Sequence, residues 1–317
     1  MKRIRLVVVG RSNDANAYNL ANNLSSIQSE FDFSVHEEMM TLPKGSNTKR
    51  PVPVETLESL GQKLIADKYP GEYPVVLCEC SLEGDLFSSY DDKVAVITTH
   101  GWTRKFSLYP VQRYIAYTLA DVLMSFYTDT PIHYETKGCV GDYCDNKKDI
   151  NIGLGKCDYC PECRALILRA VTKGTITLSQ LAAIYKILDF AAERKTCFVL
   201  MPFDKKFDPV YMTCILPTLT KRKWICTRAD RIFEPREIML LIWEQVLRVD
   251  LIIADLTGRN ANVFYELGYA HALHKNSVLI TQSIEDVPFD LRHRQMIKYA
   301  ATAKGYRALK ESLKNYV

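Results

Sequence analysis

The sequence of 317 residues has little of what marks a non-globular chain. Glycine (14) and proline (13) are few and hydrophobic residues make up 47%, which excludes collagen-like repeats, low-complexity tails and extensive disorder. A net charge of +4, from 41 basic and 37 acidic residues, gives little reason to expect a nucleic acid or a membrane surface as partner. No window approaches the roughly 18 consecutive apolar residues of a membrane-spanning helix.

The sequence also lacks a secretory leader of ordinary length. Its basic first residues are followed by an apolar run that stops at Gly10, whereas the hydrophobic region of a signal peptide has roughly 7–15 residues. We therefore expect a cytoplasmic protein, in which thiols stay reduced and clustered cysteines indicate a metal site rather than disulfides. Of the ten cysteines, five lie between Cys139 and Cys163.

The first half of the chain alternates strand-like and helix-like patterns, which predicts an α/β domain over residues 1–130. Strands are expected at 4–9, 31–35, 73–80 and 94–99, and helices at 15–27, 54–66 and 111–126. Residues 131–165 are poor in aliphatic side chains and are interpreted as a zinc knuckle that belongs to this half. Helical patterns at 165–171 and 178–192, the second capped by Thr177 or Ser179, predict a connector between the halves over residues 166–195.

The second half, residues 196–317, repeats the α/β pattern. Strands are expected at 197–201, 224–227, 251–254, 277–281 and 296–300, with helices at 235–247 and 262–274 and a helix start at Asp208-Pro209. Continuously apolar strands separated by helices predict a parallel sheet with helices on both faces. Ligands of such sheets bind outside the carboxyl ends of the strands, which selects the loops 201–207, 228–234, 255–262 and 282–294.

The cysteine spacing predicts a zinc site. Tetrahedral zinc takes four sulfur or nitrogen ligands, and short cysteine pairs separated by a loop supply them. The predicted ligands are Cys139, Cys144, Cys160 and Cys163, because Cys160-Pro-Glu-Cys163 forms a turn that opens a helix. Cys157 is then spare, and His133 is an alternative ligand. A site closed by four protein ligands leaves no coordination position for substrate, so its role is expected to be structural.

The sequence does not complete a catalytic zinc motif. His36 and Glu37 begin an HExxH-like string, but Met40 stands where the second histidine is needed. The strings AVITTHGW, GCVGDYCDNKKDINIGLG and CPECR, within residues 70–165, resemble an uncharacterised bacterial α/β domain. That resemblance implies a treble-clef-like zinc knuckle and no catalytic residue.

The densest group of polar residues follows the predicted strand at 251–254. Asp255 ends the strand, Gly258 can take a positive φ, and Asn262 is expected to cap the next helix. Helical spacing places Glu266 about one turn in, beside the stripe that packs on the sheet. Burial there raises the pKa of a carboxyl group, and a helix N-terminus lowers it. The sequence does not decide which of the two effects dominates for Glu266. The sequence also leaves open the simpler interpretation that Glu266 only complements the helix dipole.

Three strings between about residues 196 and 299 resemble the nucleoside 2-deoxyribosyltransferase-like group, which shares its fold with TIR domains: FVLMPF, DLIIADLTGRNANVFYELGYAHAL and PFDLRHRQMIKY. The resemblance implies a flavodoxin- or TIR-like parallel sheet. It also implies an N-glycosidase in which Glu266 is the nucleophile or stabilises an oxocarbenium-like centre. NAD or another nucleotide would then be the substrate rather than a cofactor.

The lack of an evident second acid near Glu266 favours one substrate. Nicotinamide leaves NAD without being protonated, so NAD hydrolysis is the expected activity, in an effector of bacterial defence that is active as a homo-oligomer. A nucleoside deoxyribosyltransferase or hydrolase is the alternative enzyme. A non-catalytic nucleotide-sensing or adaptor module is the alternative without chemistry.

Substrate contacts are expected from the loops at the carboxyl ends of the strands. The predicted residues are Phe203 for base stacking, Lys205 and Arg292 for phosphate, and Asp255 and Asn260 for sugar hydroxyls or the base edge. Asn262 is a further predicted substrate-binding residue. Solvated or core positions are the competing interpretation, and for Phe203 and Phe207 the core is favoured. Around the cysteines, lysines and aspartates are interleaved, which argues against nucleic acid and for a small-molecule nucleotide as partner.

Overall fold

The computed structural model describes residues 1–10, 14–37, 40–42, 50–102, 109–144, 147–229 and 238–317. Contacts within these ranges divide the chain into two compact units, Met1–Glu193 and Arg194–Val317, and each is described by itself. The division lies next to residue 195, where the sequence suggested a boundary. In the described ranges, no helix combines the length and apolar character needed to cross a membrane.

The first unit is built on a five-stranded sheet in the order β2-β1-β3-β5-β4. Its elements are β1 (Lys2–Val9), α1 (Asp14–Ile27), β2 (Phe31–Val35), α2 (Val54–Lys68), β3 (Tyr73–Cys78), β4 (Ser88–Tyr90), β5 (Ala95–Thr98), α3 (Val111–Ser125), α4 (Ile150–Lys156), α5 (Pro161–Lys173) and α6 (Leu178–Ala192). The first four strands in this order pair in parallel, and the edge strand β4 is antiparallel to β5.

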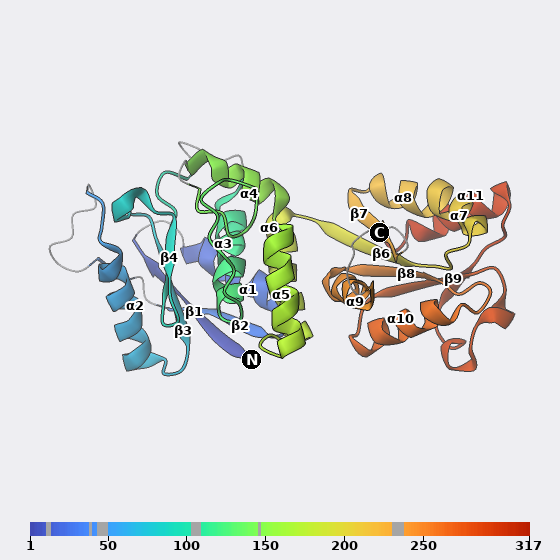
Figure 1. The fold of residues 1–317 in the computed structure, drawn as a ribbon, viewed down its shortest axis with the longest axis horizontal. Helices are drawn as coiled ribbons and strands as arrows, with labels where there is room; N and C mark the ends of the chain where they lie inside the picture. Colours follow the sequence, from blue (N-terminus) through green and yellow to red (C-terminus); the bar gives the residue numbers. More distant parts are fainter. Residues whose placement is uncertain (11–13, 38–39, 43–49, 103–108, 145–146, 230–237) are drawn as a thin grey trace. The chain divides into compact units, whose positions relative to one another are not determined.

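Alternation along β1 distributes the core of the first unit over both faces of the sheet. Leu6 and Val8 are buried in a cluster with α1, α3, α5 and α6, whereas Val7 and Val9 are buried in a second cluster with α2. Figure 1 shows α2 apart from α1 and α3, on the other side of the strands. Both faces of the sheet are therefore covered.

The predicted connector over residues 166–195 is wrong. Ile167 of α5 and Leu181 of α6 are buried in the same cluster as the sheet, so both helices belong to the first unit. Helix α6 is capped, as the sequence suggested, by Thr177, whose hydroxyl accepts a hydrogen bond from the Gln180 amide while the Thr177 amide donates to the side-chain oxygen of Gln180.

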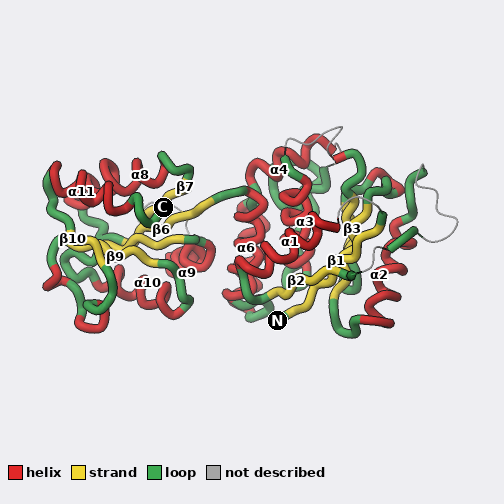
Figure 2. The backbone as a smooth tube through the Cα atoms, turned by 180° about the vertical axis from the view of Figure 1, so that it is seen from behind, coloured by secondary structure: helices red, strands yellow, loops and turns green. Residues whose placement is uncertain are grey.

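The second unit holds a five-stranded parallel sheet in the order β10-β9-β8-β6-β7. Its elements are β6 (Lys195–Leu200), α7 (Asp208–Val210), α8 (Leu216–Thr220), β7 (Trp224–Arg228), α9 (Ile238–Arg248), β8 (Leu251–Asp255), α10 (Ala261–Ala272), β9 (Ser277–Thr281), β10 (Met296–Lys298) and α11 (Ala303–Leu313). Helices α8 and α11 cover one face and α9 and α10 the other, as both ribbon views show (Figures 1 and 2).

The strand order of this sheet places a topological switch point between β6 and β8. Strands β6 and β8 are neighbours, but the chain leaves β6 toward β7 and leaves β8 toward β9, in opposite directions along the sheet. Such a point leaves a crevice at the carboxyl ends of the strands, where doubly wound α/β proteins bind their ligands. The loops after β6 and β8 are therefore the ones that position a site.

Two details of helix initiation differ from expectation. Asp208 does not cap a helix. It is the first residue of α7, and its carboxylate pairs with Arg228 at 2.7 Å. Asn260, not Asn262, caps α10, because its side-chain oxygen accepts from the amides of Asn262 and Val263 at 3.0 and 3.3 Å.

Candidate functional site

A pocket of about 370 Å³ opens at the carboxyl edge of the second sheet. It is lined by Met201, Pro202, Phe203, Asp204, Asn260, Asn262, Val263 and Glu266. The first four residues follow β6, and the others belong to the cap and the first two turns of α10, which follows β8. The pocket thus lies at the point where the connections of the sheet diverge.

Glu266 reaches this pocket because its helix is anchored by the neighbouring side chains. Val263, Leu267 and Ala270 are buried against the sheet, and Glu266 flanks that stripe with 5% of its surface exposed. Among the described residues, no hydrogen bond or ion pair engages its carboxylate. Burial, with no compensating interaction, raises the pKa of Glu266 to about 7.

The helix dipole does not explain why a glutamate stands here. The cap is Asn260, so Glu266 is the sixth residue of α10 and lies beyond its first turn. The dipole acts mainly on charges within the first turn, and the raised pKa indicates that burial dominates. A carboxyl group that titrates near neutrality inside a pocket can stabilise a developing cation or attack it.

The surroundings of Glu266 include three of the predicted substrate-binding residues. Phe203, Asn260 and Asn262 line the same pocket, from both sides of the crevice. Phe203 is 55% exposed, which overturns the expectation that it lies in the core, whereas the core position of Phe207 is confirmed at 2%. The ring of Phe203 is therefore available for stacking.

The other predicted substrate residues do not line the pocket. Asp255 is fully buried, and its carboxylate accepts from Thr257 and, at 2.6 Å, from the hydroxyl of Tyr299. Arg292 donates to the carbonyl of Val287 at 3.0 Å, and Lys205 is exposed outside the lining. Asp255 therefore braces the end of β8 internally. Most of the selected loop 228–234 lies outside the described residues.

Asp204 belongs to the pocket and was missed by sequence reasoning. Its carboxylate accepts from the Lys206 amide and pairs with the Lys206 ammonium, each at 3.0 Å. These bonds hold the pKa of Asp204 below its ordinary value, so the group stays ionised at neutral pH. Asp204 lies between Phe203 and Lys205, which are both predicted substrate contacts, and this position is the signal in the sequence that points to it.

A second candidate site, in the first unit, is a cluster of three thiols and an imidazole. The ligand atoms of His133, Cys139, Cys160 and Cys163 all lie within 4.8 Å of one another. The sulfurs of Cys139 and Cys163 are 3.8 Å apart, and the His133 Nε2 atom is 3.2 and 3.3 Å from the sulfurs of Cys163 and Cys160. In a zinc tetrahedron with Zn–S of about 2.3 Å, the edge between two sulfurs is about 3.8 Å. The cluster has the dimensions of such a site.

The fourth member of the cluster corrects the predicted ligand set. Cys144 does not join it, and His133, the alternative in the sequence, takes its place. Cys157 is also outside the cluster. It ends α4 with a φ of 42°, and its thiol donates to the carbonyl of Leu154 at 3.1 Å. The spacing identified the cysteine-rich segment but could not rank an imidazole 30 residues upstream of Cys163 above a nearer thiol.

The backbone around the cluster is held by hydrogen bonds that a ligand site requires. A carboxylate oxygen of Asp142 accepts from three consecutive amides, those of Lys137, Gly138 and Cys139. The Cys160 amide donates to the sulfur of Cys139 at 3.2 Å. Cys160 then caps α5, so the predicted turn that opens a helix is confirmed. Such outer contacts orient the ligands of metal sites.

Comparisons with known proteins give only weak likenesses. No family model matches the chain, and no curated protein is significantly similar to it. A 2-deoxyribosyltransferase from Leishmania mexicana is 16% identical, with a TM-score of 0.29 over 37% of this chain and 97% of that one. A zinc-dependent peptidase from Methanocorpusculum labreanum is 14% identical, with a TM-score of 0.38 over 52% and 99%.

A third solved structure, the C-terminal domain of glucosamine-fructose-6-phosphate aminotransferase from Francisella tularensis, is 12% identical. Its TM-score is 0.26 over all of this chain and 83% of that one. The three likenesses therefore amount to a weak resemblance in fold.

Proposed function

We propose that the second unit is an N-glycosidase that acts on a nucleotide, with NAD as the favoured substrate and nicotinamide as the leaving group. The observation that carries the proposal is Glu266, a buried carboxyl without a partner among the described residues, in a pocket at the divergence point of a parallel sheet. A weak resemblance in fold to a deoxyribosyltransferase agrees with this class but adds no argument to it.

The chemistry follows from the charge that develops when an N-glycosidic bond breaks. The bonding electrons leave with the base, and the anomeric carbon becomes oxocarbenium-like. Ionised Glu266 stabilises that carbon or forms a bond to it, and water then completes hydrolysis. Phe203 offers a ring for stacking on a base, and the amides of Asn260 and Asn262 offer polar contacts for a sugar.

The protonation states of the pocket favour a leaving group that needs no acid. Among the described lining residues only Glu266 and Asp204 carry carboxyl groups, and the bonds from Lys206 keep Asp204 ionised. If Glu266 acts as the ionised group, no described residue of the lining remains to protonate a departing purine or pyrimidine. Nicotinamide is cationic in NAD and leaves as a neutral molecule, so it fits this lining.

The full chain incubated with NAD, over a range of protein concentrations, should release nicotinamide. Glu266→Gln should lower the rate by about 100-fold or more, because it removes the group opposite the developing charge. Glu311→Gln, a matched change on the exposed face of α11, should leave the rate unaltered.

Two outcomes of this experiment would contradict the proposal and favour another function. Products from deoxynucleosides but not from NAD would favour a nucleoside deoxyribosyltransferase or hydrolase. A nucleotide that raises the melting temperature of the wild type and of Glu266→Gln equally, without any product, would identify a binding module instead.

We also infer that the cluster of His133, Cys139, Cys160 and Cys163 holds a structural zinc ion. The tetrahedral spacing of its ligand atoms supports this assignment. Four protein ligands leave no position for a substrate, so the metal would stabilise the fold of residues 133–163.

A further inference from the structure

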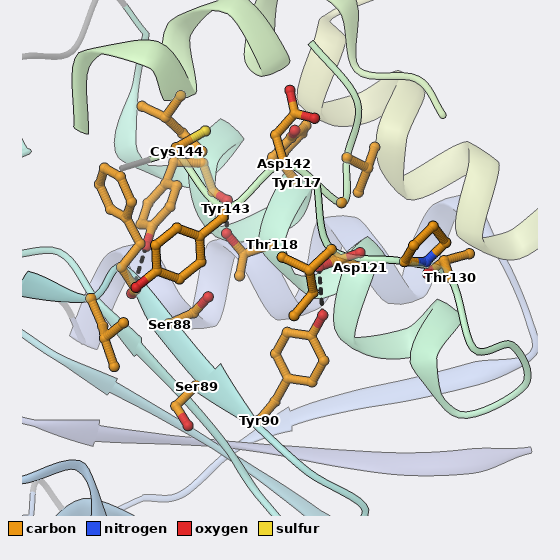
Figure 3. Close-up of a pocket in the computed structure, with 18 of the residues that line it drawn as sticks. Ser88, Ser89, Tyr90, Tyr117, Thr118, Asp121, Thr130, Asp142, Tyr143 and Cys144 are labelled. Atoms are coloured by element: carbon orange, nitrogen blue, oxygen red, sulfur yellow. Dashed lines mark hydrogen bonds between the residues drawn. The ribbon is translucent and has the colours of Figure 1, made fainter. Parts of the chain in front are cut away.

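A second pocket, of about 390 Å³, lies wholly within the first unit and has no part in the proposed glycosidase site. Its lining comes from strand β4 with the residues before it, helix α3, residues 130–132, Ile150 of α4, and the loop Val140–Cys144 that follows the metal-cluster residue Cys139. Figure 3 shows side chains from these segments converging on a common space.

The lining combines aromatic rings with two carboxylates, those of Asp121 and Asp142. Tyr90 of β4, Tyr114 and Tyr117 of α3, and Tyr143 of the loop contribute rings. Asp121 lies on α3 one turn beyond Tyr117 and accepts a hydrogen bond from the Tyr90 hydroxyl at 2.7 Å (Figure 3). None of the described residues that line this pocket carries a positive charge.

The hydroxyl groups of Tyr90, Tyr114 and Tyr117 already donate hydrogen bonds within the protein. The Tyr114 hydroxyl donates to the carbonyl of Phe87 at 2.9 Å, and the Tyr117 hydroxyl donates to the carbonyl of Cys139 at 2.9 Å. Trp102 stacks on Tyr114 with ring centroids 4.2 Å apart, which fixes that ring. The pocket therefore offers a ligand ring faces and a carboxylate that accepts hydrogen bonds.

We propose that this pocket binds a small organic cation with an apolar or aromatic body, whose ammonium group pairs with Asp121 while its body packs between the tyrosine rings. Ring faces attract cations, and a carboxylate in the same partly buried space adds charge pairing and a hydrogen bond. A ligand bearing phosphate or carboxylate is disfavoured, because Asp121 and Asp142 repel it and no described lining residue compensates. Burial raises the pKa of Asp121 to about 6, so it is ionised at pH 7.5.

Three probes of equal ring and similar length test the charge preference. They are tyramine, 4-ethylphenol and 3-(4-hydroxyphenyl)propionate, which carry positive, zero and negative charge. Titration calorimetry on the full chain at pH 7.5 should show tyramine binding at least about tenfold more tightly than 4-ethylphenol, and no detectable binding of the propionate.

Three variants test whether the preference for tyramine over 4-ethylphenol arises in this pocket. Asp121→Asn keeps an oxygen for the Tyr90 hydroxyl and should reduce the ratio of tyramine to 4-ethylphenol affinity to about one. Asp92→Asn, at an exposed carboxylate of the same unit, should keep the full ratio. Glu266→Gln should also keep it, which separates this result from the fate of the glycosidase proposal.

A further variant covers the case in which Asp121→Asn fails to fold. Ser88 shares a face of β4 with Tyr90, because side chains alternate along a strand, so Ser88→Leu should fill the pocket and weaken tyramine and 4-ethylphenol together. The proposal is overturned if tyramine and 4-ethylphenol bind equally. It is also overturned if neither binds, if the preference survives Asp121→Asn, or if Ser88→Leu leaves tyramine affinity unchanged.

Discussion

Glu266 illustrates what a buried carboxyl group costs a fold. Its pKa is raised from 4.5 to about 7 by burial alone, so the folded state binds its proton more tightly than the unfolded chain does. Between these two values stability falls as the pH rises, and above pH 7 the full cost is present. A residue kept at such a cost is a candidate for function, because an uncharged side chain would stabilise the helix better.

Glu266→Gln is expected to stabilise the second unit, and to do so more at high pH. The free energy of unfolding should rise by about 1–3 kcal/mol at pH 8 and by much less at pH 5, since the wild-type carboxyl is largely protonated there. Urea denaturation at both pH values, followed by the fluorescence of Trp224 and Trp243, measures the difference.

The control for this prediction is Glu311→Gln. Glu311 is exposed, and its pKa is lowered chiefly by the hydrogen bond from Lys314, so its removal should bring no gain at pH 8. Equal stability of Glu266→Gln and the wild type at pH 8 would contradict the argument from burial.

Asp255 is a second buried carboxyl, but its hydrogen bonds assign it a bracing role. Tyr299→Phe removes the hydroxyl that donates to Asp255 at 2.6 Å and should lower the free energy of unfolding by about 1–3 kcal/mol. Because Asp255 is outside the pocket lining, the KM of the proposed glycosidase activity should not change in the protein that remains folded. Tyr265→Phe, at an exposed position of α10, is the matched control. If Tyr299→Phe lost activity while its stability stayed unchanged, Asp255 would instead have a direct role in the active site.

At the scale of elements, sequence patterns succeeded where apolar periodicity is strong. The strand Phe31–Val35, the helix Leu178–Ala192 and the strand Ser277–Thr281 have the predicted bounds. Strand β4 was missed, because Ser88-Ser89-Tyr90 has no apolar alternation and exists only through pairing with β5. Likewise, Asn260 and Asn262 are equally good caps in the sequence, and only the backbone geometry selects Asn260.

The candidate sites show the same limit. The loops after β6 and β8 could be selected in advance, since carboxyl ends of parallel strands meet at one edge. The exposure of Phe203 and the membership of Asp204 depend on how the loop turns after Met201, which no periodicity encodes. The predicted ligand Cys144 is replaced by His133 for the same reason. The path of this loop, which has few apolar residues, decides which side chain reaches the cluster, and no periodicity encodes that path.

The metal cluster gives a prediction at the scale of the turn that opens α5. Purified protein should contain one zinc ion per chain, and His133→Ala or Cys163→Ser should lose it. Cys144→Ser and Cys157→Ser should keep it, because neither thiol belongs to the cluster. Metal analysis reads the stoichiometry, and retention of zinc by Cys163→Ser would rule out the assigned ligands.

At the scale of the whole molecule, the chain builds two separate hydrophobic interiors. The two clusters of the first unit contain only residues up to Ala192, and the two clusters of the second begin at Cys197. Each unit is large enough to bury a hydrophobic core of its own and to fold independently. Stability is therefore not one number for this chain.

The segment Arg194–Val317, expressed alone, is expected to fold. It should melt cooperatively, with a melting temperature within a few degrees of the corresponding transition in the full chain, and removal of zinc should not shift it. Calorimetry of the full chain should resolve a second, zinc-dependent transition from Met1–Glu193. A segment without cooperative melting would show that the second unit depends on the first.

The buried carboxyl group of Glu266, which has no partner in the described part of the chain, also determines how many protons are released when a ligand binds. A ligand with a positively charged ring beside it favours the ionised form, so near pH 7 association expels part of a proton into the buffer. The apparent binding enthalpy then varies with the ionisation enthalpy of the buffer, and acid weakens binding by mass action. An uncharged nucleoside in the same position would release no proton, so the buffer dependence reports the charge of whatever the pocket accepts.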